Sequence, residues 1–290
     1  MLQNHLEKLK GFRAIAEHGS ILKASQMIGI SQPALTKSLR LLEDAVGTKL
    51  FVRHQRGITL TEGGIELSIF CDRLFQDLLD VEMKVKIPNK ISGVIQVGSY
   101  ETLGISFWPK VLKELKQRHP SLRIQITTEN PNTIWQRLDN GSLHLIVDAE
   151  PPLHEKYFSK SLYTDKFGLY CSPRFTSLEG ALPVSYVKRA FDHEKRTIQE
   201  HLRKRHVDHD LLFDFDSFTS VRAVTLEEMA VGVMPTSLVQ EELDKGKLKP
   251  FLVDGAPLYF GEHKVCVTCL EERRKDPRLA EVIKVLKTNN

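Results

Sequence analysis

The sequence of 290 residues is poor in cysteine and has no long hydrophobic run. Its four cysteines are too few for the disulfide framework of a small secreted domain. No segment approaches the roughly 18 to 20 apolar residues that a membrane-spanning helix needs. The segment 1–10 mixes acids, bases and leucines, without the charged and then apolar pattern of a signal peptide. We therefore expect a cytoplasmic protein with no membrane partner.

The short motifs of the common enzyme classes are absent as well. The chain has no GxSxG, no HExxH, no phosphate-cradling glycine loop and no GxGxxG after a strand. We therefore expect no catalytic residues, no enzyme activity and no cofactor. The candidate functional residues of this sequence are therefore binding residues.

The histidines and cysteines are not spaced to hold a metal ion. Cys266 and Cys269 lie in the alternating run 264–270, and residues three apart on a strand point to opposite faces. We interpret all four cysteines as small buried residues. Four histidines lie near one another in the sequence: His193, His201, His206 and His209. Since His201 and His206 are five residues apart, they do not share a helix face, and we expect no metal site.

The positive charge is concentrated in the first fifth of the chain. Residues 1–61 contain nine Lys and Arg against four Asp and Glu, a net charge of +5, whereas the remainder has a net charge of −1. A local basic excess of this kind attracts phosphate groups. The basic segment is therefore the candidate for contact with a nucleic acid.

Three short helices are predicted between residues 6 and 43. Apolar residues recur at helical spacing in each, and a glycine ends each of the first two: Gly19 and Gly29. Serines can cap the second and third: Ser20 and Ser31. Pro33 is tolerated in the first turn, where backbone N–H groups have no partner inside the helix. Helix, glycine-containing turn and helix are typical of a helix-turn-helix.

A small hairpin and a long helix are expected next. The runs 50–53 and 57–60 have strand character and predict a wing, and Thr61 can cap a helix that continues until Pro88. The apolar stripe of this helix keeps a spacing of three and four residues and is formed by Leu67, Phe70, Leu74, Leu78, Val81 and Val85. Such a stripe must be buried, and a second copy of the chain is the natural partner.

Strands and helices alternate in the rest of the chain, which predicts a parallel α/β sheet. The expected strands are 91–97, 122–128, 143–147 and 157–171. The expected helices are 103–118, 133–138, 193–205 and 277–288. Further units are expected at 181–186, 211–215, 217–229 and 231–234.

The third predicted helix has a polar and basic face near its start. An N-terminally docked recognition helix needs such side chains to reach base edges in the major groove. The candidate DNA-binding residues of this helix are Ser31, Gln32, Pro33, Thr36, Lys37 and Arg40. In the wing, Arg53 and Arg56 can reach the flanking backbone or the minor groove.

The segment 6–64 resembles the N-terminal domain of the LysR-type transcriptional regulators. The residues that carry the resemblance are Phe12, Gly19, Ser20, Ala24, Ser31, Gln32, Pro33, Ala34, Leu35, Thr36, Arg40, Leu42, Glu43, Gly47, Leu50, Phe51, Arg53, Leu60, Thr61 and Gly64. Ser25 departs from the family, which usually has a second alanine there. Further marks of the family's regulatory domain include Val97, Gly98, Trp108, Pro109, Gly141, Ser217, Phe218 and Gly232.

The resemblance implies an α/β protein overall, with a winged helix-turn-helix domain at 1–61 and a linker and dimerisation helix at 62–88. Two α/β subdomains follow that resemble a periplasmic-binding-protein fold and are joined by crossing strands. Subdomain I would comprise 91–160 and 266–290, and subdomain II would comprise 161–265. The family also implies an effector cleft between the subdomains and a homodimer through the linker helix, usually assembled into a homotetramer.

The effector site is expected beyond the carboxyl ends of the strands. The candidate effector-binding residues are Tyr100, Glu101, Thr102, Asn130, Tyr186 and Phe218. Asn130 is favoured as a helix cap. Glu101 replaces the small hydroxyl residues that the family often has there and would repel an anion. Because Glu228 also stands where the family often has glycine, a neutral or cationic effector is favoured.

These features predict a regulator that binds double-stranded DNA at target promoters in response to a small-molecule effector of unknown identity. RNA polymerase is a further expected partner there. One alternative is a ligand-binding receptor or transport-type binding protein without a DNA role, and the basic N-terminal unit opposes it. Another is an enzyme on an α/β scaffold, which the missing catalytic motifs oppose.

Overall fold

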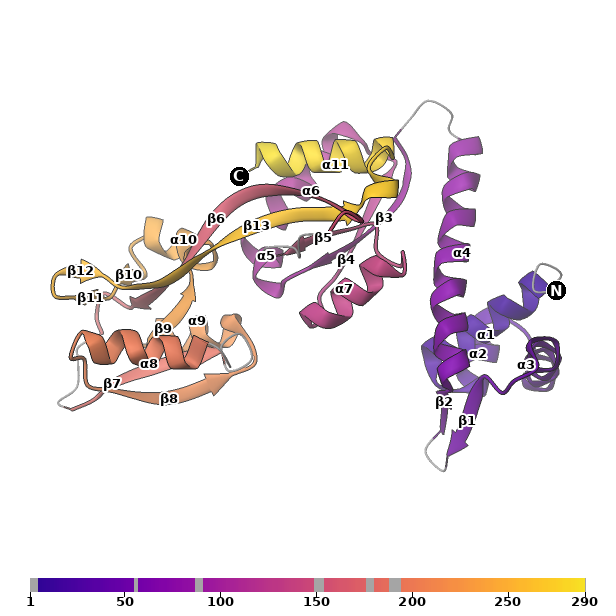
Figure 1. Ribbon diagram of the computed structural model, residues 1–290, viewed down its shortest axis with the longest axis horizontal. Helices are drawn as coiled ribbons and strands as arrows, with labels where there is room; N and C mark the ends of the chain where they lie inside the picture. The colour runs from indigo at the N-terminus through magenta and orange to yellow at the C-terminus, as the bar shows by residue number, and fades with distance from the viewer. Residues whose placement is uncertain are drawn as a thin grey trace. The chain divides into compact units, whose positions relative to one another are not determined.

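The computed structural model describes residues 5–54, 57–86, 91–148, 154–175, 180–187 and 194–289. The chain divides into two compact units (Figure 1). The first comprises Met1–Val94 with Asp139–Leu143, and the second comprises Ile95–Leu138 and His144–Asn290. The first unit holds the basic segment, and the second holds most of the predicted α/β region.

The first unit is a winged helix-turn-helix followed by a long helix. Its elements are α1 (Leu6–His18), α2 (Ile21–Ile28), α3 (Gln32–Val46), β1 (Phe51–His54), β2 (Gly57–Leu60) and α4 (Glu62–Lys86). The β1–β2 hairpin is antiparallel, with Phe51 opposite Leu60 and His54 opposite Gly57. The predicted end of the long helix at Pro88 lies outside the described residues.

Capping residues fix the helix boundaries of the first unit. The Ser20 hydroxyl accepts a hydrogen bond from the Lys23 N–H at 3.4 Å, and the Ser31 hydroxyl accepts one from the Ala34 N–H at 3.3 Å. Both caps are confirmed, because each satisfies an N–H that has no partner within its helix. Helix α3 continues past the predicted end at Glu43 and stops at Gly47, which has the left-handed φ of +81°.

The helices of this unit pack around one apolar core. Its buried residues are Leu9, Phe12, Ala14, Ile15, Ala24, Leu35, Leu39, Leu42, Leu50, Phe51, Leu67 and Cys71. The first turn of α4 lies against the start of the hairpin, since a Cβ at Gly64 would come within 2.1 Å of the Leu50 carbonyl oxygen. Only glycine allows this approach, and it fixes α4 against the wing.

From residue 93 onward the chain forms one mixed sheet covered by helices. The strands are β3 (Gly93–Ser99), β4 (Leu122–Thr127), β5 (Leu145–Asp148), β6 (Tyr157–Cys171), β7 (Leu182–Val187), β8 (His209–Phe215), β9 (Val231–Pro235), β10 (Lys249–Pro250) and β13 (Tyr259–Leu270), with a separate hairpin of β11 (Leu252–Val253) and β12 (Ala256–Pro257). The helices are α5 (Glu101–Ser106), α6 (Trp108–Arg118), α7 (Pro131–Asp139), α8 (Glu194–Lys204), α9 (Phe218–Leu226), α10 (Thr236–Asp244), the 3₁₀ turn Glu271–Arg273 and α11 (Pro277–Thr288).

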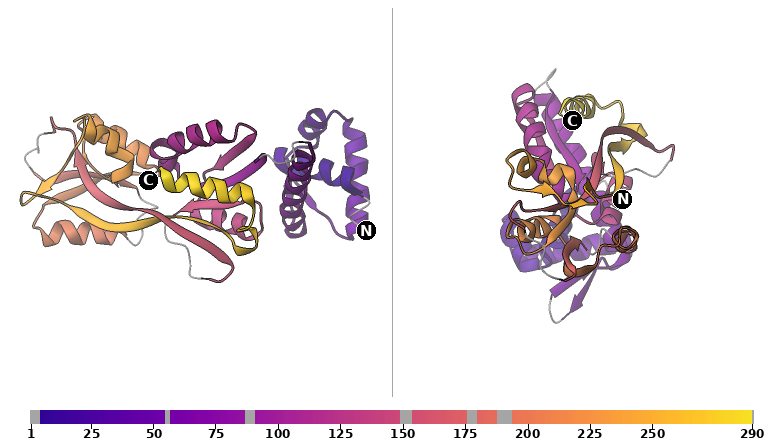
Figure 2. Two further views of the ribbon diagram at one scale, coloured as in Figure 1. Left: turned by 90° about the horizontal axis from the view of Figure 1, so that it is seen from above. Right: turned by 90° about the vertical axis from the view of Figure 1, so that its left-hand side faces the viewer.

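The strand order in the described part is β4-β3-β5-β13-β6-β9-β7-β8, with β10 beside β6. Strands β3 and β5 are parallel, and so are β7 with β8 and with β9. The long strands β6 and β13 pair antiparallel from Tyr157 opposite Leu270 to Tyr259 opposite Gly168. Figures 1 and 2 show them running side by side between two groups of elements.

These two groups are the two subdomains of the second unit. Subdomain I contains β3, β4 and β5 with α5, α6, α7 and α11, and subdomain II contains β7, β8 and β9 with α8, α9 and α10 (Figure 1). The implied fold of two α/β subdomains joined by crossing strands is confirmed. The expectation of a parallel sheet holds within each subdomain and is corrected at the crossing strands, which are antiparallel to their neighbours.

Two differences from the predictions concern which helices form in the second unit. The predicted helix 103–118 is broken into α5 and α6 at Phe107. Pro109 accounts for the break, because it has no N–H to donate to the carbonyl four residues before it and its ring crowds that turn. Helix α10 was not predicted from the sequence and begins directly after β9.

Candidate DNA interface and effector site

The predicted DNA-binding face of α3 is exposed in the structure. The side chains of Gln32, Lys37 and Arg40 lie on the surface, whereas Leu35 and Leu39 on the opposite face are buried. Ser31 and Pro33 are also exposed at the helix start. The first turn of α3 therefore presents polar side chains and backbone N–H groups to solvent, as a groove-reading helix requires.

Thr36 has a more specific arrangement than the sequence indicates. Its hydroxyl donates a hydrogen bond of 2.9 Å to the Gln32 carbonyl oxygen, one turn earlier. The hydroxyl proton is thus used within the helix, which leaves the methyl group and the oxygen lone pairs for contact with DNA. Thymine carries a methyl group in the major groove that suits the former.

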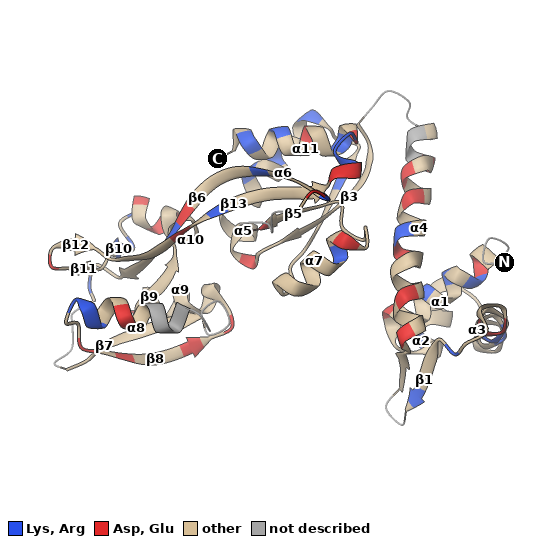
Figure 3. Ribbon diagram, viewed as in Figure 1, with Lys and Arg blue, Asp and Glu red and all other residues tan. Residues whose placement is uncertain are grey.

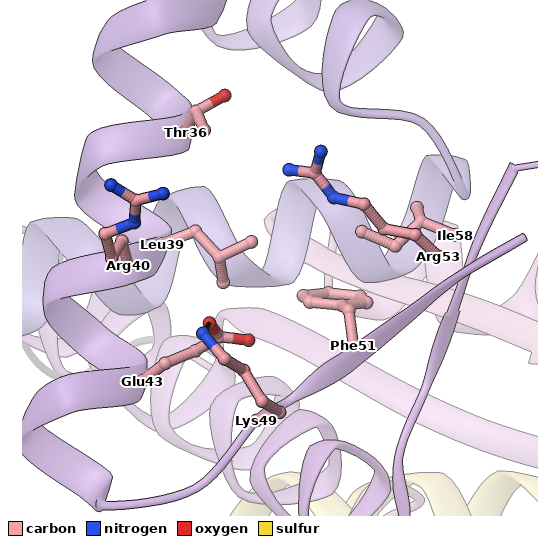
Figure 4. A pocket seen from close by; sticks show the side chains of 8 residues that line it. All are labelled: Thr36, Leu39, Arg40, Glu43, Lys49, Phe51, Arg53 and Ile58. Atoms are coloured by element: carbon pink, nitrogen blue, oxygen red, sulfur yellow. Dashed lines mark hydrogen bonds and ion pairs between the residues drawn. The ribbon is translucent and has the colours of Figure 1, made fainter.

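Helix α3 and the hairpin together line a hollow of about 290 Å³ (Figure 4). Its walls are Thr36, Leu39, Arg40, Glu43, Lys49, Phe51, Arg53 and Ile58. The guanidinium groups of Arg40 from α3 and Arg53 from β1 both face this space. Two elements separated in sequence therefore present cations to the same volume.

A buried carboxylate fixes the segment between α3 and the hairpin. Glu43 accepts hydrogen bonds from the Lys49 ammonium at 2.7 Å and from the Leu50 N–H at 3.0 Å. Burial raises the pKa of Glu43, but these hydrogen bonds and the charge of Lys49 outweigh burial and lower the pKa below its ordinary value. The charged form of Glu43 is therefore part of the folded state.

The hairpin carries the predicted wing residues. Arg53 is exposed on β1 and is the one Lys or Arg of that strand (Figure 3). Across the hairpin, the His54 imidazole and the Thr59 hydroxyl share a hydrogen bond of 2.9 Å. Arg56 lies outside the described residues.

The apolar stripe of α4 is covered along one part of its length only. Leu67 is 8% exposed and belongs to the core of the first unit, and Leu74 packs against that core. The other members of the stripe are exposed: Phe70, Leu78, Val81 and Val85. The predicted dimerisation residues therefore divide between the unit's own core and a free apolar surface.

In the second unit, Glu101 is the predicted effector residue with the most defined contacts. Glu101 begins α5 in subdomain I, and its carboxylate accepts hydrogen bonds from the Ser217 hydroxyl and from the Thr219 hydroxyl at 3.1–3.2 Å. These hydroxyls belong to the start of α9 in subdomain II. Ser217 and Thr219 were not among the predicted effector residues. The signal that the sequence offered for them was the helix start indicated by Asp-Ser-Phe-Thr.

Aromatic rings lie next to this contact. The Phe218 ring lies 5.6 Å from the Phe167 ring, and the His263 ring lies 5.0 Å from the Phe167 ring. Phe167 and His263 come from the crossing strands β6 and β13. Phe218 is thus placed beside the crossing strands.

The remaining predicted effector residues have different surroundings. Asn130 caps α7, because its side-chain oxygen accepts a hydrogen bond of 3.0 Å from the Thr133 N–H, so its favoured role as a cap is confirmed. Tyr186 is 2% exposed and lies in the core of subdomain II, because it sits on the central strand β7. Tyr100 and Thr102 flank Glu101 and are half-buried.

Glu228 lies at the opposite end of α9 from Ser217 and Thr219, the residues that contact Glu101. It follows the last turn of α9, whereas Ser217 and Thr219 lie at the first turn. Its carboxylate accepts a hydrogen bond of 3.1 Å from the Ser172 hydroxyl, and its φ is +64°. This left-handed conformation explains why glycine suits the position, and Glu228 gives no support for a charge at the effector site.

The described side chains outside these sites do not form a metal site. In the part of the chain that the structure describes, no three His, Cys, Asp or Glu side chains come together as ligands, and His193 lies outside that part. Cys266 and Cys269 are buried in β13. None of the helices within the described ranges has the length and apolar character that crossing a bilayer requires.

The first unit has a winged helix-turn-helix with an exposed polar recognition face, and the second unit has two α/β subdomains on crossing strands. These features put the chain in the class of DNA-binding proteins with an appended α/β domain. Two sequence families match the chain. The bacterial regulatory helix-turn-helix protein, lysR family, matches residues 6–65, and the LysR substrate binding domain matches residues 88–290. The chain belongs to the LysR family of DNA-binding transcriptional regulators.

Relatives and solved structures agree with this assignment. The chain is 27% identical over 234 residues to the HTH-type transcriptional regulator YofA of Bacillus velezensis, which covers 80% of this chain and 81% of the relative. Its fold is similar to that of CbnR, a LysR family transcriptional regulator, with a TM-score of 0.69, 16% identity and 98% of each chain covered. It is also similar to Vibrio fischeri DarR in complex with DNA, with a TM-score of 0.59, 18% identity, and 98% and 99% of the two chains covered.

Proposed function

We propose that α3 and the β1–β2 hairpin bind promoter DNA together, and that a small-molecule effector acts on the region where the two subdomains meet. The observation that carries this proposal is the hollow between α3 and the hairpin, into which Arg40 and Arg53 both project. A helix in the major groove with a basic wing on the flanking backbone would use these two cations on one stretch of duplex.

Individual roles follow from the chemistry of the exposed side chains. Gln32 suits the paired donor and acceptor of adenine, and Lys37 and Arg40 suit guanine or phosphate. Ser31 and the N–H groups at the start of α3 suit phosphate. Arg53, with Arg56 beyond the described residues, suits the flanking backbone.

The exposed half of the α4 stripe supports assembly into a homodimer or homotetramer. Leu78, Val81 and Val85 would cost free energy if they stayed in water, and a second copy of α4 offers a matching surface. Regulation at a promoter makes RNA polymerase a further partner and places the protein in the cytoplasm with the chromosome. The function proposed is binding without catalysis.

A DNase I footprint on the DNA upstream of the chain's own gene tests this function. Two symmetric copies of α3 would protect two half-sites one or more helical turns apart, with spacings near multiples of about 10 base pairs. Failure to protect any duplex would contradict the proposal. Small-molecule binding without any protection would instead favour a receptor with no DNA role.

A further inference from the structure

Glu101 ties the two subdomains together through side-chain hydrogen bonds. The Ser217 hydroxyl lies 3.2 Å from Glu101 Oε1 and 3.1 Å from Oε2, and the Thr219 hydroxyl lies 3.1 Å from Oε1. The carboxylate belongs to subdomain I and both hydroxyls belong to subdomain II. The Glu101 side chain therefore links the two subdomains in addition to the crossing strands.

The chemistry of the contact favours a charged acceptor. The Ser217 oxygen already accepts a hydrogen bond from the Thr219 N–H at 3.1 Å, which leaves its proton to point at the carboxylate. Hydrogen bonds to an ionised acceptor are roughly twice as strong as those between neutral groups. The start of α9 also carries the partial positive charge of a helix N-terminus. A free carboxylate would be held by the same groups.

The surroundings allow this contact to break without disturbing the core. Phe218 lies between the two hydroxyl residues, and its ring packs on Phe167 of crossing strand β6. The first turn of α9 is therefore positioned by apolar packing whether or not Glu101 is in place. Helix α10 of subdomain II also contacts α5, so the two subdomains keep a second contact next to Glu101.

We propose that Glu101 is a built-in latch, which holds the two subdomains together in the effector-free state and has to release Ser217 and Thr219 when an effector enters. The chain's own carboxylate thus occupies hydroxyls that an acidic ligand would otherwise use. This proposal rests on the proposed role of the inter-subdomain region as the effector site.

The latch is tested by measuring the distance between the subdomains in the full-length protein. Spin labels at Lys116→Cys on α6 and Lys204→Cys on α8 report on opposite subdomains, and both positions are exposed. The four native cysteines are buried. Labelled chains are mixed with an excess of unlabelled chains, so that each assembly carries one labelled copy.

The key variant is Glu101→Ala, and Glu129→Ala is its matched control. Glu129 is in subdomain I and pairs with Arg137 of the same subdomain at 2.8 Å, so its loss removes an equal charge without touching subdomain II. We expect Glu101→Ala to broaden and lengthen the distance distribution, and Glu129→Ala to leave it as in the wild type. Glu101→Gln keeps an acceptor oxygen and should fall between them. An unchanged distribution in Glu101→Ala would overturn the latch.

A thermal double-mutant cycle gives a second readout. Glu101→Ala and Thr219→Val should each lower the Tm of the regulatory unit, by about 2–4 °C at most, and the double variant should lose no more than Glu101→Ala alone. Additive losses would contradict the contact. DNA binding of the same proteins separates the two proposals. If the proteins bind the operator but the distance distribution of Glu101→Ala is unchanged, only the latch is contradicted. If they bind no operator but the distance distribution changes as expected, only the DNA-binding role is contradicted.

Discussion

The exposed side chains near the start of α3 differ in what they can read. Gln32 is the first residue of the helix and carries both a donor and an acceptor, whereas Arg53 on the hairpin carries donors alone. Contacts to base edges specify a sequence, and contacts to phosphates position the protein on any duplex. Substitutions of Gln32 and Arg53 should therefore change DNA binding in different ways.

Gln32→Ala is expected to cost about 1–3 kcal/mol of operator binding and to relax specificity at one base pair. Arg53→Ala is expected to weaken binding to all sequences alike and to reduce the dependence on salt. Fluorescence anisotropy with the operator and its single-base variants measures both effects. Identical behaviour of the two proteins across all operators would show that this division of roles is wrong.

Glu43 makes the first unit sensitive to acid. Its folded-state pKa lies below the ordinary value, so its stabilisation is complete at neutral pH and is lost as the pH falls below the ordinary glutamate range and through the lowered pKa. Protonation removes the charged acceptor for Lys49 and for the Leu50 N–H. The loop that sets the wing against α3 should therefore loosen in acid.

Glu43→Gln should lower the stability of the first unit by about 1–3 kcal/mol at neutral pH and remove most of this acid dependence. Cys71 reports the opening of this unit, because it is fully buried in its core and burial, with the nearby Asp72, raises the pKa of its thiol to about 12. Pulse labelling of Cys71 in urea, with a dipyridyl disulfide that reacts in acid, gives the midpoints. Equal pH profiles for the two proteins would contradict the role of Glu43.

At the scale of elements, local chemistry was sufficient to predict most of the first unit. Ser20, Ser31 and Thr61 cap the helices that follow them, because each cap depends only on residues within one turn. The break at Phe107 was missed because the apolar spacing continues across it, although Pro109 carried the signal. Helix α10 was missed because it follows a buried strand without a polar linker, and Asp165 of β6 supplies its cap from a distance by accepting hydrogen bonds from Ser237.

The free part of α4 should hold the subunits together. Val81→Asp places a charge among exposed apolar side chains and is expected to dissociate the oligomer at micromolar concentration, with loss of operator binding. Analytical ultracentrifugation measures the mass. Leu74 is a poorer choice for this test, because it packs against the core of its own unit.

Arg73→Asp is the matched control for this helix. It also introduces an acid on α4, but Arg73 is exposed, lies off the apolar stripe and forms an ion pair with Asp77 of the same helix, so its loss leaves the stripe intact. The control should remain assembled. If both variants stayed oligomeric, the dimer would have to form through another surface.

At the scale of the whole molecule, the charge distribution and the family resemblance predicted the two-part organisation. The contacts of Glu101 were beyond the reach of the sequence, since Ser217 is 116 residues away and meets it only after both subdomains have folded. Tyr186 was expected at the effector site because of its position near the end of a strand. Its strand is covered on both faces, however, and the side chain is buried. The position of a residue along a strand can be predicted from its neighbours in the sequence. The burial of that strand within the sheet cannot, because it depends on elements that are distant in the sequence.

Operator affinity as a function of salt tests the central claim most directly, that two paired copies of α3 lie in duplex DNA. Fluorescence anisotropy of the footprinted operator should show tight binding that weakens steeply as salt rises, because Lys and Arg release counterions from phosphates. A scrambled duplex should bind far more weakly at the same salt. Equal affinity for both duplexes, or a monomer that binds neither at low salt, would contradict the account.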